Sequence, residues 1–235
     1  MYLWIIATVV AYFIKGLCGF ANTLVFTTIL SFGTPNVNIS PIDLLIGYPT
    51  NLILTWENRK KLDSKVYLPL IALVIIGSIP GVFMLKNVNT SIIKLIFGVV
   101  VIVLGLEMLL REYSKDSGKS SRILLAIIGV ASGVLCGLFG VGALLAAYVS
   151  RVTDDSQANI SAVFIVDNTF RIILYSTLHI LTLDTLKRGL ILIPFVLIGL
   201  IAGMKCSSIM NKNLAKKITA LLLVISGISL VIKNI

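Results

Sequence analysis

Eight long apolar runs divide this sequence, and their length constrains the fold more than any other feature. The runs cover about residues 1–34, 41–56, 66–85, 92–110, 123–150, 157–178, 189–209 and 214–232. Most are near the roughly 20 residues that an α-helix needs to cross the hydrocarbon core of a bilayer. Only helices and closed barrels satisfy their backbone hydrogen bonds there, and these runs do not alternate as barrel strands do. We therefore predict an all-α polytopic membrane protein with a single transmembrane domain over residues 1–235.

The composition agrees with a membrane protein. Hydrophobic residues make up 57% of the 235 residues and charged residues 13%, against roughly 25% charged residues in a soluble domain. The net charge of +10 would indicate nucleic-acid binding in a soluble protein, but Lys and Arg gather here between the apolar runs. The positive-inside rule predicts this distribution for cytoplasmic loops. We therefore expect a lipid bilayer around the protein and no nucleic-acid partner.

The two halves of the chain share short motifs. Leu-Cys-Gly at 17–19 recurs at 135–137, which is 118 residues later, and Gly77 and Gly81 recur 122 residues later as Gly199 and Gly203. We predict two homologous halves of four segments each, repeat 1 at 1–112 and repeat 2 at 120–235. Small residues at this spacing also pack membrane helices closely, so the glycine pairs by themselves do not indicate a function.

Glycine interrupts the first segment of each half near its middle. Lys15-Gly16 and Gly19 interrupt the first run, and the fifth run is interrupted by Gly133, Gly137, Gly140 and Gly142. Breaks at corresponding places in two halves are typical of a transporter's binding site. A half-helix that starts inside the membrane offers free N–H groups and its positive dipole end to an anion. The alternative interpretation is a long, tilted helix whose glycines only permit close packing.

The positively charged residues distinguish two topologies. If runs one and five each cross the membrane once, the Lys and Arg residues other than Lys15 and Arg171 divide 11 to 7 between the two sides. If each run folds back as a re-entrant hairpin, the division becomes 13 to 5, and the smaller group consists of Lys86, Lys94, Lys187, Arg188 and Lys233. The hairpins would also make the halves inverted repeats. The stronger asymmetry favours the hairpins and inverted repeats.

Three stretches carry a resemblance to a known family. They are FIKGLCGFANTLVFTTIL at 13–30, GLFGVGALLAAYVSRVTDD at 137–155 and LTLDTLKRGLILIPFVLIGLIAGM at 181–204. Together they resemble the TauE/SafE family of sulfite and organosulfonate exporters. The resemblance implies two homologous halves, no cofactor, and transport of sulfur-containing or related organic anions along the two glycine-rich segments. The family's usual Gly-Gly or Gly-Gly-Pro run after the second glycine motif is replaced here by Gly142-Ala143-Leu144, which weakens the inference to a particular substrate.

A charged pair in the sixth run is the first candidate for a substrate site. Charged side chains inside apolar runs are costly in a membrane, so each one is a candidate for function. Asp167 and Arg171 are four residues apart, so a helix places them on one face, where they can form an ion pair. The planar guanidinium of Arg171 suits an oxyanion such as sulfite or a sulfonate. The alternative is a structural pair that never contacts substrate.

Further candidates lie near the glycine breaks. Lys15 precedes the first break, where it either belongs to the site or extends to a membrane interface. The other candidates for substrate binding are Cys18, Gly19, Asn22, Asn51, Cys136, Gly137, Gly140 and Asn168. The amides also suit packing between helices, and the cysteines also suit small hydrophobic filler. Asp43 and Glu107 are acids that can take a proton in a coupled cycle, although we expect both, near helix ends, to reach water.

These observations favour a secondary transporter. We predict that it moves sulfite, an organosulfonate or a related sulfur-containing or carboxylate anion by alternating access at a midplane site between the two repeats. We expect the inner membrane of a prokaryotic cell, with no cofactor and no metal. A coupling proton or cation and a homo-oligomer remain open.

Two other classes compete with transport. A membrane-embedded enzyme needs a nucleophile with a base, or a metal cluster. The single histidine, His179, has no His or Cys at ligand spacing, and the sequence contains no GxxxxGK[ST] motif, so we expect no enzyme and no catalytic residues. An accessory or assembly subunit of a larger membrane complex remains the alternative.

Overall fold

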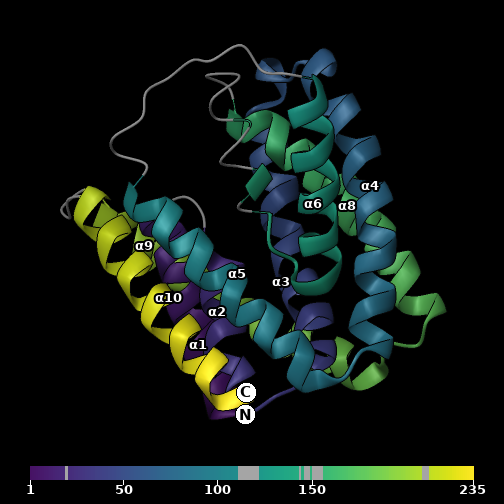
Figure 1. Ribbon diagram of the computed structural model, residues 1–235. Helices are drawn as coiled ribbons and strands as arrows, with labels where there is room; N and C mark the ends of the chain where they lie inside the picture. Colours follow the sequence, from purple (N-terminus) through teal and green to yellow (C-terminus); the bar gives the residue numbers. More distant parts are fainter. Residues whose placement is uncertain (19–20, 111–121, 143, 146–148, 150–155, 208–211) are drawn as a thin grey trace.

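The computed structural model describes residues 1–18, 21–110, 122–142, 144–145, 149, 156–207 and 212–235 (Figure 1). Its elements are α1 (Tyr2–Cys18), α2 (Asn22–Ser31), α3 (Asn36–Glu57), η1 (Arg59–Lys61), α4 (Ser64–Asn87), α5 (Thr90–Leu110), α6 (Arg122–Phe139), α8 (Ser156–Thr177), α9 (Leu183–Ser207) and α10 (Lys212–Asn234). The described part of the chain contains helices and no strands. The predicted all-α class is confirmed.

Five described segments are long and apolar enough to cross a bilayer. They are Ser64–Asn87, Thr90–Leu110, Ala158–Thr177, Leu183–Cys206 and Lys217–Asn234. These segments correspond to the third, fourth, sixth, seventh and eighth apolar runs, so the predicted multi-pass membrane class is confirmed. The second run forms α3, a helix of 22 residues that contains Pro41 and Pro49 and is not one of these five segments.

The first and fifth runs are broken, as the glycines predicted. The first run forms α1 and α2, and α2 follows Ala21, whose backbone is left-handed with φ 71°. In the fifth run, α6 ends at Phe139 and is followed by Gly140 with φ 73°. The ten residues of α2 extend only about 15 Å, which is half of the roughly 30 Å hydrocarbon core. Helix α2 is therefore too short to cross a membrane.

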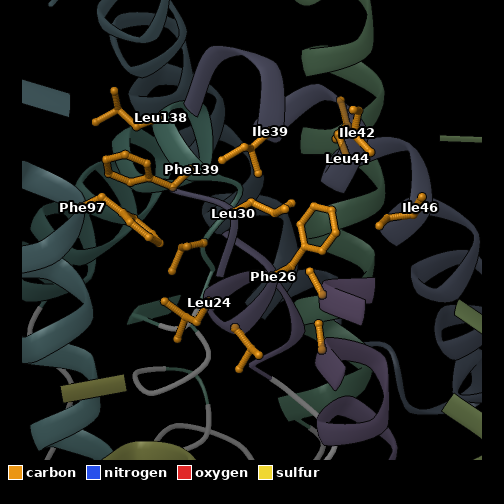
Figure 2. Close-up of a cluster of buried hydrophobic side chains, with 14 of the residues drawn as sticks. Leu24, Phe26, Leu30, Ile39, Ile42, Leu44, Ile46, Phe97, Leu138 and Phe139 are labelled. Atoms are coloured by element: carbon orange, nitrogen blue, oxygen red, sulfur yellow. The ribbon is translucent and has the colours of Figure 1, made fainter. Parts of the chain in front are cut away.

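Helix α2 lies in the core although it is short. Its side chains Leu24, Phe26 and Leu30 are buried against α3, α5 and the end of α6, and Figure 2 shows them beside one another. At the end of α6, the ring of Phe139 lies 4.7 Å from the ring of Phe97 on α5, measured between centroids. Burial of this apolar surface holds the half-length helix in place.

Two pairs of helices pack in parallel through glycine. A side chain on Gly81 of α4 would collide with the carbonyl of Val134 on α6, and one on Gly203 of α9 would collide with the carbonyl of Phe13 on α1. In both pairs, later residues of one helix meet later residues of the other. Helices α4 and α6 therefore run parallel, as do α1 and α9. Glycine permits this close approach of two backbones in a membrane helix pair.

Helices α5 and α10 pack in the opposite sense. Gly98, early in α5, meets Gly227 late in α10, whereas Gly105, late in α5, meets Ala220 early in α10. The two helices are therefore antiparallel. Both chain termini lie at the same end of the molecule (Figure 1).

The contacts of the first half recur in the second half with the partners exchanged. Phe13 contacts Gly203, and Val134 contacts Gly81. Val134 is 121 residues after Phe13, and Gly81 is 122 residues before Gly203. Gly16 and Gly137 likewise take matching places against α9 and α4. Corresponding contacts in the two halves are therefore 121 or 122 residues apart, whereas the Leu-Cys-Gly motifs are 118 residues apart, a difference of about one helical turn. By its contacts, the counterpart of Gly137 is Gly16 and not Gly19.

Candidate functional site

The predicted ion pair on α8 is confirmed. Arg171 Nε lies 3.0 Å from Asp167 Oδ2, and both side chains are buried, with exposed fractions of 4% and 1%. The four-residue spacing in a helix brings the two groups together without help from other elements.

The pair also ties α8 to two neighbouring helices. Arg171 Nη1 donates to the carbonyl of Cys136 on α6 at 2.7 Å, and Arg171 Nη2 donates to Asn168 Oδ1 at 2.7 Å. The second oxygen of Asp167 accepts a hydrogen bond of 2.6 Å from Ser78 Oγ on α4. The pair therefore has a structural role in this conformation.

Three successive carbonyls at the end of α6 receive side-chain donors. Arg171 donates to Cys136, Tyr175 donates to the carbonyl of Gly137 at 3.1 Å, and Ser40 of α3 donates to the carbonyl of Leu138 at 3.0 Å. The last carbonyls of a helix have no partner within the helix, and leaving them unpaired in an apolar environment costs several kcal/mol. A cation at this end also interacts favourably with the helix dipole. The break after Phe139 is thus supported by α3 and α8.

Asp43 of α3 faces the same break. A Cβ atom on Gly140 would come within 3.2 Å of Asp43 Oδ2 and 3.6 Å of Arg171 Nη1, so both groups surround this glycine. Thr23 in the first turn of α2 donates to Asp43 Oδ2 at 2.8 Å. Asp43 is only 4% exposed, so the expectation that it reaches water is wrong. The fold covers it because α2 packs over the second turn of α3.

Lys15 is also buried, which excludes the interpretation that it extends to an interface. It is 8% exposed, and its Nζ donates to Thr50 Oγ1 of α3 at 2.6 Å. Thr50 Oγ1 in turn donates a hydrogen bond of 2.7 Å to the carbonyl of Gly47. Lys15 lies in the last turn of α1, where its charge complements the negative end of the helix dipole.

The contacts of Lys15 and Arg171 occupy matching places. Lys15 of α1 contacts Thr50 of α3, and the residues 121 positions later, Cys136 and Arg171, contact each other between α6 and α8. In the first half the cation comes from the broken helix, and in the second half it comes from the long helix beside it. Each broken helix therefore has one buried cation near its carboxyl end.

The remaining predicted residues differ in their placement. Asn22 donates to Thr23 Oγ1 at 3.5 Å and so borders Asp43, whereas Asn51 is half-buried near the end of α3. Cys136 is buried with its thiol 3.5 Å from the carbonyl of Val141. Gly137 packs against Ser78 and Gly81 of α4, which is the structural role that the sequence left open. Gly19 and the side chain of Cys18 lie outside the described residues.

Several residues of the site were not predicted from the sequence. They are Thr23, Ser40, Thr50, Ser78 and Tyr175, and each hydrogen-bonds to a charged group or to the end of α6. Asp43 and Thr50 are seven residues apart on α3, so their shared helix face was a usable signal. The partners on other helices had no such signal.

The charges of the site balance when both acids are ionised. The charged side chains that the structure describes as buried are Lys15, Asp43, Asp167 and Arg171. The charges of Arg171 and Lys15 both act on the Asp43 carboxylate, although neither forms a direct ion pair with it among the described contacts. The described residues include no group of three or more His, Cys, Asp or Glu side chains that could hold a metal ion.

Comparison with known proteins gives one result. A family model described as sulfite exporter TauE/SafE matches residues 4–230. No curated protein and no solved structure matches the chain.

Proposed function

We propose, because the chain belongs to the TauE/SafE sulfite exporter family, that it is a secondary transporter of a small anion in the inner membrane of a prokaryotic cell. The family is a transporter family, and the five apolar helices fit a multi-pass membrane protein. The proposed cargo is sulfite, an organosulfonate or a related sulfur-containing or carboxylate anion.

One observation carries the proposed site: a buried cation lies near the carboxyl end of each broken helix. Arg171 and Lys15 supply these charges inside the protein, where an anion without a compensating charge would cost several kcal/mol. The first N–H groups of α2 add donors near Thr23, since the first turn of a helix leaves them without intrahelical partners. The anion is proposed to bind among Arg171, Lys15 and this turn when the site opens.

The proposed mechanism is alternating access between two inverted repeats. Each crossing reverses the chain, so four single crossings after α5 would leave α10 parallel to α5. Helices α5 and α10 are instead antiparallel, as the contacts of Gly98 and Gly105 with α10 indicate. This supports one more reversal of chain direction between the two helices, which a hairpin in the fifth run provides. The parallel packing of α1 on α9 then requires a further reversal in the first run. Antiparallel counterparts are expected of repeats related by an axis in the membrane plane.

Bonds between the repeats suit such a cycle. Arg171 holds the end of α6 within the second half, but Ser78 reaches Asp167 from α4 of the first half, and Ser40 reaches the end of α6 from α3. These bonds cross from one repeat to the other and would be exchanged as the site opens to either side. The described conformation, with Arg171 fully engaged, is proposed to be the occluded state.

Counterflow in liposomes that contain only this chain tests the proposal. Vesicles are loaded with sulfite, sulfate, thiosulfate, sulfoacetate, taurine or acetate, and uptake of the same labelled compound is measured. We expect exchange of at least one anion by the wild type and by Lys187→Gln, a change at an exposed position of α9. Arg171→Gln should be nearly inactive, and Arg171→Lys should retain some flux with weaker affinity, because it keeps the charge but loses the planar fork. Absence of exchange by the wild-type chain would favour an accessory subunit.

A further inference from the structure

The Asp43 carboxylate has one oxygen without a hydrogen-bond partner. Asp43 Oδ2 accepts from Thr23, but Asp43 Oδ1 is buried and has no donor among the described groups. A buried carboxylate oxygen without a donor is costly, and protonation of the acid removes most of that cost. The unpartnered oxygen is therefore the position on Asp43 that is available to a proton.

Asp167 does not share this property. Its Oδ2 pairs with Arg171 and its Oδ1 accepts from Ser78, so both oxygens already have partners. Asp43 therefore differs from Asp167 in having one carboxylate oxygen without a partner. The two buried acids have different tasks because their surroundings differ.

The groups around Asp43 come from several helices. They are Tyr12 and Lys15 of α1, Thr23 of α2, and Arg171, with its partner Asp167, of α8. Gly140 contributes no side chain, and a Cβ atom there would contact Asp43 Oδ2, Thr23 Cγ2 and Arg171 Nη1. Two positive charges thus act on an acid that neither of them pairs with directly.

We propose that Asp43 binds a proton together with the transported anion, so that the two move as a pair. This inference rests on the proposed transport function. With Asp43 ionised, the four buried charges cancel and an entering anion meets a neutral site. With Asp43 protonated, the site carries one net positive charge, which compensates a monoanion. By linkage, the anion strengthens proton binding at Asp43 by the same factor by which the proton strengthens anion binding.

Transport of methanesulfonate tests this coupling, because a sulfonate stays ionised from about pH 5 to 8 and any pH dependence then belongs to the protein. For one proton per anion, the affinity should fall about tenfold for each pH unit above the midpoint. A pH gradient that is acidic outside should drive accumulation, and replacement of sodium by choline should change nothing. Accumulation that follows sodium instead of pH would overturn the proposal.

Variants locate the proton. Asp43→Asn mimics the protonated acid, so counterflow should persist with no pH dependence, and a pH gradient should no longer drive accumulation. Thr23→Val removes a donor to the ionised acid and should move the midpoint to higher pH. Asp43→Glu should retain coupling, and the exposed Asp184→Asn should behave as the wild type. Retention of the wild-type pH profile by Asp43→Asn would overturn the assignment.

A measurement without cargo separates the two proposals. Infrared difference spectra of the purified protein between about pH 5 and 8 should contain a protonated-carboxyl band that is absent from Asp43→Asn. If the wild type carries none of the tested anions yet shows this band, the proposed function fails and the proton site stands. If it carries an anion without pH dependence and lacks the band, the proton site fails and the function stands.

Discussion

The hydroxyl of Tyr48 lies 2.9 Å from Thr169 Oγ1, and the two residues are 121 positions apart. They are counterparts in the proposed repeats, since the same offset relates Lys15 to Cys136 and Thr50 to Arg171. A residue that touches its own counterpart lies at the axis that relates two halves. In the proposed alternating-access mechanism, the site residues on α3 and α8 would lie on either side of this axis.

The hairpin topology predicts which loops share a side of the membrane. In a background without the native cysteines, Tyr2→Cys and Gly33→Cys should react with an impermeant maleimide from one side, and Lys60→Cys from the other. All three positions are exposed, so packing within the protein does not shield them from the reagent. Reaction of positions 2 and 33 from opposite sides would leave two parallel repeats instead.

Close packing at Gly137 predicts sensitivity to a single methyl group. A Cβ atom there would lie 2.5 Å from the Ser78 carbonyl oxygen and 2.9 Å from Val82 N, so α4 and α6 must separate. We expect Gly137→Ala to lose about 1–3 kcal/mol of stability, and Gly137→Leu to abolish flux while still inserting. Thermal unfolding in detergent measures this, with Gly33→Ala as the control because nothing lies within 4 Å of a Cβ atom at Gly33. Equal stability of the two alanine variants would contradict the described packing.

The Asp167–Arg171 pair can be tested for a role beyond structure. Either Asp167→Asn or Arg171→Gln leaves one buried charge unpaired, at a cost of about 3–5 kcal/mol, and the double variant should recover expression. We expect the double variant to remain without anion flux, since the site then lacks the cation. Asp167→Asn should reduce flux less than Arg171→Gln does. Recovery of flux in the double variant would remove Arg171 from the substrate site.

The buried cation is on the broken helix in the first half and on the long helix beside it in the second half. This difference predicts that the charge in the first half can be moved from α1 to α3. Lys15→Cys should lose a charge-assisted hydrogen bond of about 1.5–3 kcal/mol and most of the flux. Adding Thr50→Arg copies the Cys136–Arg171 arrangement into the first half and should restore part of the flux. Counterflow of the single and double variants decides this, and Thr50→Arg with Lys15 retained is the control that should not improve transport.

Capping of α6 predicts the effect of a single hydroxyl. Tyr175→Phe keeps the ring but leaves the Gly137 carbonyl without the donor that it has at 3.1 Å. We expect a loss of about 1–3 kcal/mol in unfolding free energy. Tyr48→Phe, which removes a hydroxyl from a less buried contact with Thr169, should cost less. A larger loss from Tyr48→Phe would argue against the capping role.

The sequence by itself was sufficient for the helices, their breaks and the ion pair on α8, all of which depend on residues close together in the chain. The apolar runs predicted the helices, because a span of fixed length must satisfy its backbone hydrogen bonds internally. The glycines predicted the breaks after Cys18 and Phe139. The spacing of Asp167 and Arg171 predicted their ion pair, since four residues return a helix to the same face.

Only the tertiary structure decided which residues meet across helices. The motif match made Gly19 the counterpart of Gly137, whereas the helix contacts make Gly16 its counterpart. The reason is that the counterparts are the glycines at which two helix backbones come close together. Asp43 near a helix end was expected to reach water, but α2 folds over it and Thr23 binds it. Burial and charge compensation depend on segments far apart in the chain, and no local pattern encodes the way in which those segments pack.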